Sequence, residues 1–382
     1  MRAQLERDFE RFGRALPPDF PAHVREAYRI DLSARYLGET IPHPIGKGSG
    51  QLSLREEQLA TDADAGLAFV VLKTVIAQDE AGSQAMAAWA IHETRMAVEQ
   101  VPAPGGLTGW TVTWKGRGWD RSFDEYLRLV RAGRDYTRDR RLLCIPSAKF
   151  HLPLLNEPFR EQEYRFTTRA IADAWGPTRL LLEKDFSPTL AGDSLADERA
   201  RILRWIREVP AQIRKAAPNG VALALKLMNA RFGDEFQLEM LHAAAEVKVD
   251  AAVVFNRLFD DQRKVAFGGW ELSGRNLQVL DMARARSVAP GLTLSGTGNI
   301  CQGRVLLAYA RLGAESVQLH TFFQLPLREY PATGGSRTSR ALHSIVFHPQ
   351  HGLIAGLLDL EASGRLARRD GELRFLDVVG IG

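Results

Sequence analysis

Short, continuously apolar runs alternate with amphipathic stretches along most of the chain. The runs lie near Ile45 and at residues 67–72, 141–145, 179–183, 221–226, 251–255, 292–295 and 316–319. Between them apolar residues recur every three to four positions, as at residues 197–216 and 237–247, which predicts helices. Strands that are apolar at every position are buried on both faces, as in a parallel sheet covered by helices. The pattern therefore predicts an α/β protein built from eight βα units.

Eight such units favour a closed (β/α)8 TIM barrel over an open, doubly wound sheet, which periodicity alone does not exclude. Residues 82–118 break the pattern with an Ala/Met/Trp-rich helical segment and then a Pro/Gly-rich stretch at 101–107. We expect this region to be an elaborated loop at the catalytic face. No linker divides the chain, so we expect residues 1–34 to form an N-terminal helical extension and residues 35–382 to form the barrel with C-terminal helices.

The N-terminal extension has its own apolar pattern. Leu5, Phe9, Phe12 and Leu16 recur at helical spacing among charged residues. Such a helix typically packs on the domain or caps the barrel floor, and the alternative is peripheral membrane contact through residues 1–16. The sequence has no long apolar run of the length that a transmembrane helix needs.

Composition narrows the class of protein. The chain has 382 residues, of which 45% are hydrophobic, and its 50 basic and 46 acidic residues are interspersed. This indicates a soluble globular protein with a mixed surface and no nucleic-acid-binding face. Cys144 and Cys301 lie far apart, which predicts neither a disulfide nor a zinc site and favours a cytoplasmic location. His92 lacks a second histidine at helical spacing, so we expect no metal site.

Candidate chemistry lies where the apolar runs end. Residues 292–299 run from a strand into glycines, and residues 316–321 form a second buried strand that ends in a small hydroxyl residue. The last two loops of a barrel commonly build a phosphate site in this way, which predicts a phosphate-bearing cofactor. Lys73 and Lys226 also follow apolar runs, and a buried lysine needs an anionic partner, either a ligand or a neighbouring carboxylate.

Several segments occur in the order seen in dihydroorotate dehydrogenases. They are residues 43–50, 71–74, 183–188, 225–227, 268–277, 295–300 and 313–321. The chain resembles this family of flavin mononucleotide (FMN) barrels, which act in pyrimidine biosynthesis, over roughly residues 35–330. The resemblance implies hydride transfer from a small-molecule substrate to FMN, while a side chain removes a proton from the adjacent carbon.

The resemblance also implies the cofactor site. The phosphate would be held near Gly296, Gly298, Asn299, His320 and Thr321. The isoalloxazine ring would be lined by Gly48, Ser49, Gly50, Lys73, Thr74 and Lys226, with Ser273 and Gly274 in a neighbouring loop. The imidazole of His320, where the family has glycine or tyrosine, would either bond a phosphate oxygen or fill the space.

The substrate site departs from the family pattern. Ser187 is the candidate base before the proline of a segment that is one residue shorter here, and a serine is a weak base without help. Among the substrate-binding candidates Asn256 keeps one family asparagine, whereas Asp185 and Thr189 stand where two others would be. Replacing amides that pair with a pyrimidine ring weakens its binding, so both dihydroorotate and a related cyclic substrate stay open.

Three functions follow from these patterns. The first is an FMN-dependent oxidoreductase acting on a CH–CH bond next to a carbonyl, in dihydroorotate or a related ring. The second is a catalytically degenerate flavin-binding relative with a binding or regulatory role. The third is a phosphate-binding lyase or isomerase barrel without flavin, which leaves the segments 48–50 and 73–74 unexplained. The electron acceptor and the oligomeric state, with a homodimer as one alternative, stay open.

Overall fold

The computed structural model describes residues 1–87, 96–102, 108–114, 118–186, 199–260, 265–298 and 300–382. Its main sheet has ten parallel strands in the order β6-β10-β11-β12-β13-β16-β17-β4-β5-β9. Their bounds are β4 Ile45–Lys47, β5 Phe69–Val71, β6 Val75–Ile76, β9 Leu143–Ile145, β10 Ser147–Lys149, β11 Leu180–Asp185, β12 Val221–Met228, β13 Ala251–Asn256, β16 Leu294–Gly296 and β17 Ala314–Leu319.

The sheet closes into a barrel. Only Pro146 separates β9 from β10, so these two strands are halves of one barrel strand that a residue without an amide hydrogen interrupts. β9 pairs with β5, and β10 pairs with β11. In the same way β5 and β6 together form the second barrel strand. The ten strands are therefore eight barrel strands in a ring, as the sequence predicted, and the open sheet is excluded.

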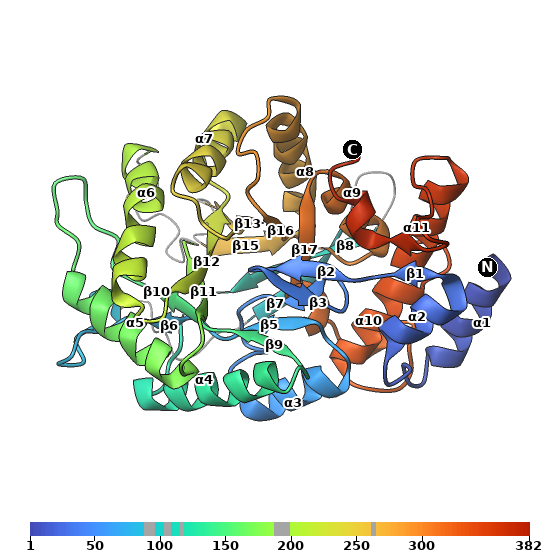
Figure 1. The fold of residues 1–382 in the computed structure, drawn as a ribbon, viewed down its shortest axis with the longest axis horizontal. Coiled ribbons are helices and arrows are strands. Elements are labelled where there is room, and N and C mark those ends of the chain that lie inside the picture. The colour runs from blue at the N-terminus through green and yellow to red at the C-terminus, as the bar shows by residue number, and fades with distance from the viewer. Residues whose placement is uncertain (88–95, 103–107, 115–117, 187–198, 261–264, 299) are drawn as a thin grey trace.

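Helices follow the eight barrel strands in turn and surround them (Figure 1). Their bounds are α3 Glu56–Asp64, α4 Phe123–Arg138, α5 Glu161–Trp175, α6 Arg199–Ala216, α7 Gly233–Glu246, α8 Trp270–Ala285, α9 Gly303–Arg311 and α10 Arg337–Phe347. The start of α4 illustrates the local cause: Ser122 accepts from the Glu125 amide, and Glu125 caps Ser122 in return. Helix α4 packs closely on β9 at Gly133, because a Cβ there would lie 2.9 Å from Cys144 Cβ.

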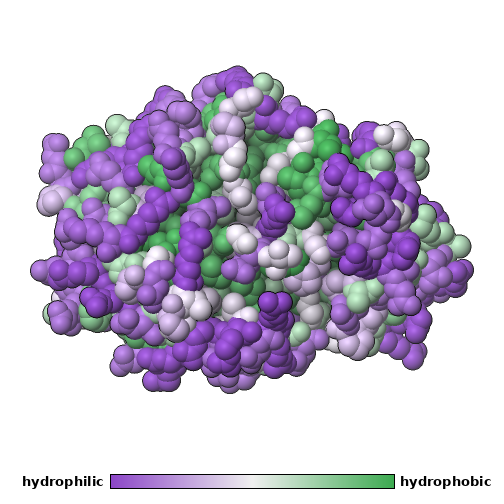
Figure 2. All heavy atoms as spheres, viewed as in Figure 1, coloured by the Kyte–Doolittle hydropathy of each residue, from purple (hydrophilic) through white to green (hydrophobic). Residues whose placement is uncertain are grey.

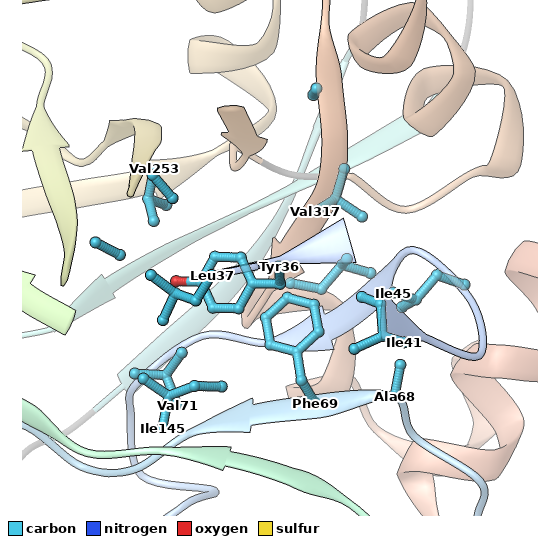
Figure 3. Packing of buried hydrophobic residues seen from close by; sticks show 14 of the residues in the cluster. Tyr36, Leu37, Ile41, Ile45, Ala68, Phe69, Val71, Ile145, Val253 and Val317 are labelled. Atoms are coloured by element: carbon cyan, nitrogen blue, oxygen red, sulfur yellow. The ribbon is translucent and has the colours of Figure 1, made fainter. Parts of the chain in front are cut away.

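A hairpin closes the amino-terminal end of the barrel. It consists of β2 (Ala34–Tyr36) and β3 (Glu39–Ile41), and it carries Tyr36 into the barrel. The Tyr36 ring stacks on Phe69 with a centroid distance of 4.6 Å, among Val253, Val317 and other aliphatic side chains of the strands (Figure 3). Because apolar side chains fill this floor of the barrel, we expect the functional site at the opposite, carboxyl-terminal end of the strands.

The N-terminal helices pack on the C-terminal ones (Figure 1). The elements are α1 Arg2–Phe12, α2 Phe20–Tyr28, β1 Ile30–Asp31, α11 Leu353–Ala362 and β18 Leu373–Arg374, and β1 pairs with β18. Leu5 and Phe12 are buried, and Phe9 stacks on His343 of α10. The apolar face of α1 is thus covered by protein.

Most of the face shown in Figure 2 is hydrophilic, and hydrophobic residues are visible mainly towards its centre. Across the described ranges, no helix combines the length and the apolar character that crossing a bilayer demands.

A second, antiparallel sheet has the order β14-β15-β8-β7. Its strands are β14 Leu258–Asp260, β15 Val265–Gly269, β8 Thr108–Trp114 and β7 Met96–Pro102. The expected loop at residues 82–118 therefore contains two paired strands, while most of its Ala/Met/Trp-rich segment lies outside the described residues. β8 follows the second barrel strand and β15 follows the sixth, so their pairing joins opposite sides of the ring.

Candidate functional site

Two adjoining cavities lie at the carboxyl ends of the barrel strands. The first, which we call the rim cavity, has a volume of about 50 Å³. It is lined by Gly48, Ser49, Gly50, Gln51, Lys73, Thr74, Gly118, Lys149, Asp185, Lys226, Asn256, Arg257, Thr297, Gln318 and His320. The second, the cradle cavity, has about 40 Å³. It is lined by Phe255, Asn256, Arg257, Gly268, Gly269, Leu272, Thr297, Gly298, Ile300, Gln318, Leu319, His320, Thr321 and Phe322.

The rim cavity is rich in buried cations. Lys226 Nζ lies 3.4 Å from Glu183 Oε1, and Lys149 Nζ lies 3.5 Å from Asp185 Oδ2. All four side chains are nearly inaccessible to solvent. The sequence left open whether a buried lysine pairs with a ligand or with a neighbouring carboxylate. Lys226 has a carboxylate partner within the barrel, Glu183, and Lys149 likewise has Asp185.

Lys73 lies in the same cavity at the end of β5. Burial lowers the pKa of its ammonium to about 7, and the nearby positive charges of Arg257 and Lys149 act in the same direction. Asp120 and Asp185 oppose this shift but do not cancel it. Lys73 thus changes charge near neutral pH, and an anion bound beside it would favour the charged form.

A chain of hydroxyl groups fixes the loop after β4. Ser49 Oγ lies 2.8 Å from Thr74 Oγ1, and Thr74 Oγ1 lies 3.0 Å from Ser147 Oγ. The Gly48 amide donates to Leu319 O at 2.9 Å. These bonds hold the backbone of Gly48, Ser49 and Gly50 at the cavity wall, where a flat ligand could approach it closely.

A buried polar chain joins the floor of the barrel to the rim cavity. Gln318 Nε2 donates to Tyr36 Oη at 2.9 Å and to Glu183 Oε2 at 2.7 Å. The other oxygen of Glu183 faces Lys226. Burial, together with the Glu183 charge, raises the pKa of Tyr36 well above its usual value, so its hydroxyl stays protonated. This chain fixes the orientation of the carboxylate that faces Lys226.

His320 is part of the wall of both cavities. A Cβ built on Gly50 would lie 1.7 Å from His320 Nε2, so the ring rests directly on that glycine. Burial lowers the pKa of His320 well below its usual value, and the charges of Lys226 and Lys73 lower it further. The ring is therefore a neutral imidazole at the wall that the two cavities share.

The turn after β16 is shaped by close packing. A Cβ on Gly296 would lie 2.6 Å from the Tyr309 ring, so this glycine faces α9 and not the cavities. Gly298 has φ +117°, and a Cβ there would lie 2.7 Å from Asn276 Nδ2. Gly298 and Thr321 both line the cradle cavity, which brings together parts of the last two loops.

The expectation that Ser273 and Gly274 lie in a loop is wrong, because both belong to helix α8. Leu272, Asn276 and Val279 recur at helical spacing on the buried face of this helix. Gly274 is exposed, so its missing side chain costs the helix little packing. Ser273 Oγ donates to Gly298 O and thus stabilises the backbone that lines the cradle cavity.

The structure brings most of the candidate residues to one place. Nine of them line the rim cavity: Gly48, Ser49, Gly50, Lys73, Thr74, Asp185, Lys226, Asn256 and His320. Ser187, Thr189 and Asn299 lie outside the described residues. Sequence reasoning missed Arg257 and Gln318. Arg257 directly follows the strand-ending Asn256, and Gln318 is a polar residue within an apolar run, so both carried a readable signal.

Comparisons with known proteins support the fold. No family model matches the sequence, and no curated protein matches it. Among solved structures, the chain is similar to a crystal structure of DHODH, a dihydroorotate dehydrogenase, from Eimeria tenella in complex with ferulenol. The two share 16% sequence identity with a TM-score of 0.60, over 92% of this chain and 88% of that chain. This protein therefore has an α/β barrel fold like that of DHODH.

Proposed function

We propose that the protein is an FMN-dependent oxidoreductase that oxidises a CH–CH bond next to a carbonyl, in dihydroorotate or a related cyclic substrate. The observation that carries this proposal is that Lys73 and Lys226, from the second and fifth barrel strands, line one buried cavity with the loop of Gly48, Ser49 and Gly50. Two ammonium groups beside a close backbone approach suit a flat ring that gains negative charge on reduction.

The charged groups and hydrogen-bond donors at this site suit FMN, but the two cavities are too small for it. Cavities that hold organic ligands typically measure about 300–1,000 Å³, whereas the rim cavity has about 50 Å³ and the cradle cavity about 40 Å³. The His320 ring lies between the two. FMN therefore fits this donor set only when that side chain moves.

Each part of the chain has a role in this proposal. Bound FMN would supply the hydride acceptor. Lys73 and Lys226 would stabilise negative charge on the ring, and the amides around Gly298 and Asn299 would hold the phosphate with Thr321. Asp185, Thr189 and Asn256 would orient the substrate. Ser187 would remove the proton, for which its hydroxyl needs a water molecule or neighbouring group that accepts its own proton.

One observation favours a second candidate, a flavin-binding relative without turnover. By the resemblance to dihydroorotate dehydrogenases Asp185 would stand where a substrate-binding amide is expected, and Lys149 holds it in an ion pair. A paired carboxylate offers acceptors but no donor to a pyrimidine ring. Such a protein would bind FMN but would not pass electrons from dihydroorotate or a ring analogue to it.

Two measurements separate these functions. Purified protein should show flavin absorbance or acquire it with added FMN. Lys226→Met should weaken that binding at least tenfold, which corresponds to about 1.4 kcal/mol, because it removes a cation from the cavity wall. Lys215→Met, at an exposed lysine of α6, is the matched control. Anaerobic dihydroorotate should then bleach the flavin. Bound FMN without bleaching by any ring analogue would favour the second candidate, and a colourless protein that rejects FMN would exclude both.

A further inference from the structure

His320 lies in the wall of both the rim cavity and the cradle cavity. Asn256, Arg257, Thr297 and Gln318 line both cavities, as His320 does, so the two spaces adjoin along a shared wall. The imidazole reaches across this wall to Gly50, on the loop after the first barrel strand. A ligand that extends from the rim cavity into the cradle cavity would meet this ring.

The position of the ring depends on side chains as well as on the backbone. Gly50 leaves room for it, since even a methyl group there would overlap Nε2. Gln324 Nε2 also contacts the ring, at 2.7 Å from His320 Nδ1 and 2.9 Å from its Nε2. His320 immediately precedes the 3-10 helix η4 (Thr321–Gln324). A rotation about its side-chain bonds could therefore open the passage without a change in the barrel strands.

We propose that His320 is a specificity-determining residue, whose side chain closes the passage between the rim and cradle cavities and must be displaced by any ligand that spans both. The ligand class is a phosphate-tailed aromatic molecule, with its ring in the rim cavity and its phosphate in the cradle cavity. This inference rests on the proposed function for the identity of that molecule as FMN, but not for the closure itself. Displacement lowers the apparent affinity of every spanning ligand, because only the open fraction of the protein binds.

The test compares wild-type protein with His320→Ala, using FMN, riboflavin, AMP and inorganic phosphate as probes. If the ring only closes the passage, the variant should bind FMN and riboflavin about tenfold more tightly, in equal measure, and FMN should associate faster. Phosphate alone, which fits one cavity, should bind equally to both proteins. Gln324→Ala, which frees the ring without removing it, should give a smaller gain. His242→Ala, at an exposed histidine, is the matched control.

Other results would overturn the inference. If His320→Ala weakened FMN binding but left riboflavin binding unchanged, the imidazole would be a phosphate ligand and not a barrier. A crystal structure of the wild-type FMN complex with the ring still against Gly50 would also contradict it. If neither protein bound FMN but the variant gained affinity for AMP, the proposed function would fail while the closure stood. Failure of both proteins to bind any of these molecules would remove both proposals.

Discussion

The protonation state of Lys73 makes ligand binding depend on pH. Its pKa of about 7 means that the ammonium is charged below that pH and neutral above it. We therefore expect affinity for FMN to fall as the pH rises through and beyond 7, with a midpoint above 7 in the complex because the bound anion favours the charged form. Lys73→Arg, which stays charged, should show little such fall. Titrations by flavin fluorescence check this, and a wild-type affinity that is independent of pH would contradict it.

Lys184 is another buried lysine, but it does not line either cavity. Its Nζ lies 4.5 Å from the centre of the Phe186 ring and donates to Asp185 O, and burial lowers its pKa to about 7. Because the unfolded chain binds this proton more tightly, the free energy of unfolding should rise with pH from about 7 towards 10.5, the usual lysine value.

Lys184→Met should remove this rise and stabilise the protein below pH 7 by roughly 1–4 kcal/mol. Urea unfolding on both sides of pH 7 measures the effect, with Lys215→Met as the exposed control. An unchanged pH profile in Lys184→Met would show that the lysine is not the source.

At the scale of single residues, the sequence revealed the charged side chains that are costly to bury. It did not reveal contacts between residues that are far apart in the sequence. Lys73 and Lys226 stand out because charged residues rarely follow apolar strands without a partner. The position of the His320 ring depends on Gly50, which is far away in the sequence, so no local pattern reveals it. The pairing of Asp185 with Lys149 is likewise visible only in three dimensions.

A buried ion pair connects one barrel strand with two of the surrounding helices. Lys47 of β4 donates to Asp62 of α3, and Thr338 of α10 donates to the same carboxylate at 2.7 Å. Removing Asp62 would leave the ammonium buried without its counter-charge. Asp62→Ala should therefore destabilise the protein by about 3–5 kcal/mol.

A double variant provides the control for this pair. Lys47→Met combined with Asp62→Ala should recover much of the lost stability, because it removes the orphaned charge. Equilibrium unfolding of the three variants measures the coupling between the two residues. Strict additivity of the two single losses would mean that the pair does not act as a unit.

At the scale of elements, the barrel strands were predictable because each is apolar along its whole length. Element ends were less so: β16 begins at Leu294, two residues after the start of the expected range. The paired strands β7 and β8 were read as part of a loop. The second partner of β8, strand β15, lies more than 140 residues further on, and short-range periodicity does not report such pairing.

At the scale of the whole molecule, the N-terminal helix is part of the core. Leu5 is completely buried, and α1 packs against α10 and α11. Leu5→Ala should lower the free energy of unfolding by about 2–5 kcal/mol. Glu6→Ala, one position away on the exposed face of α1, should change it by no more than about 0.5 kcal/mol. Thermal unfolding compares the two, and equal melting temperatures would mean that α1 detaches before the barrel unfolds.

The pairing of β8 with β15 restricts how this barrel could be assembled from parts. The two strands come from different halves of the chain, and each lacks a partner edge when the other half is removed. Half-barrel fragments, or chimaeras that exchange one half with a plain barrel, would leave one edge of β8 or β15 unpaired at the entrance, and such edges promote aggregation. A chimaera that stays soluble would therefore need both strand pairs, β7–β8 and β14–β15, from the same protein.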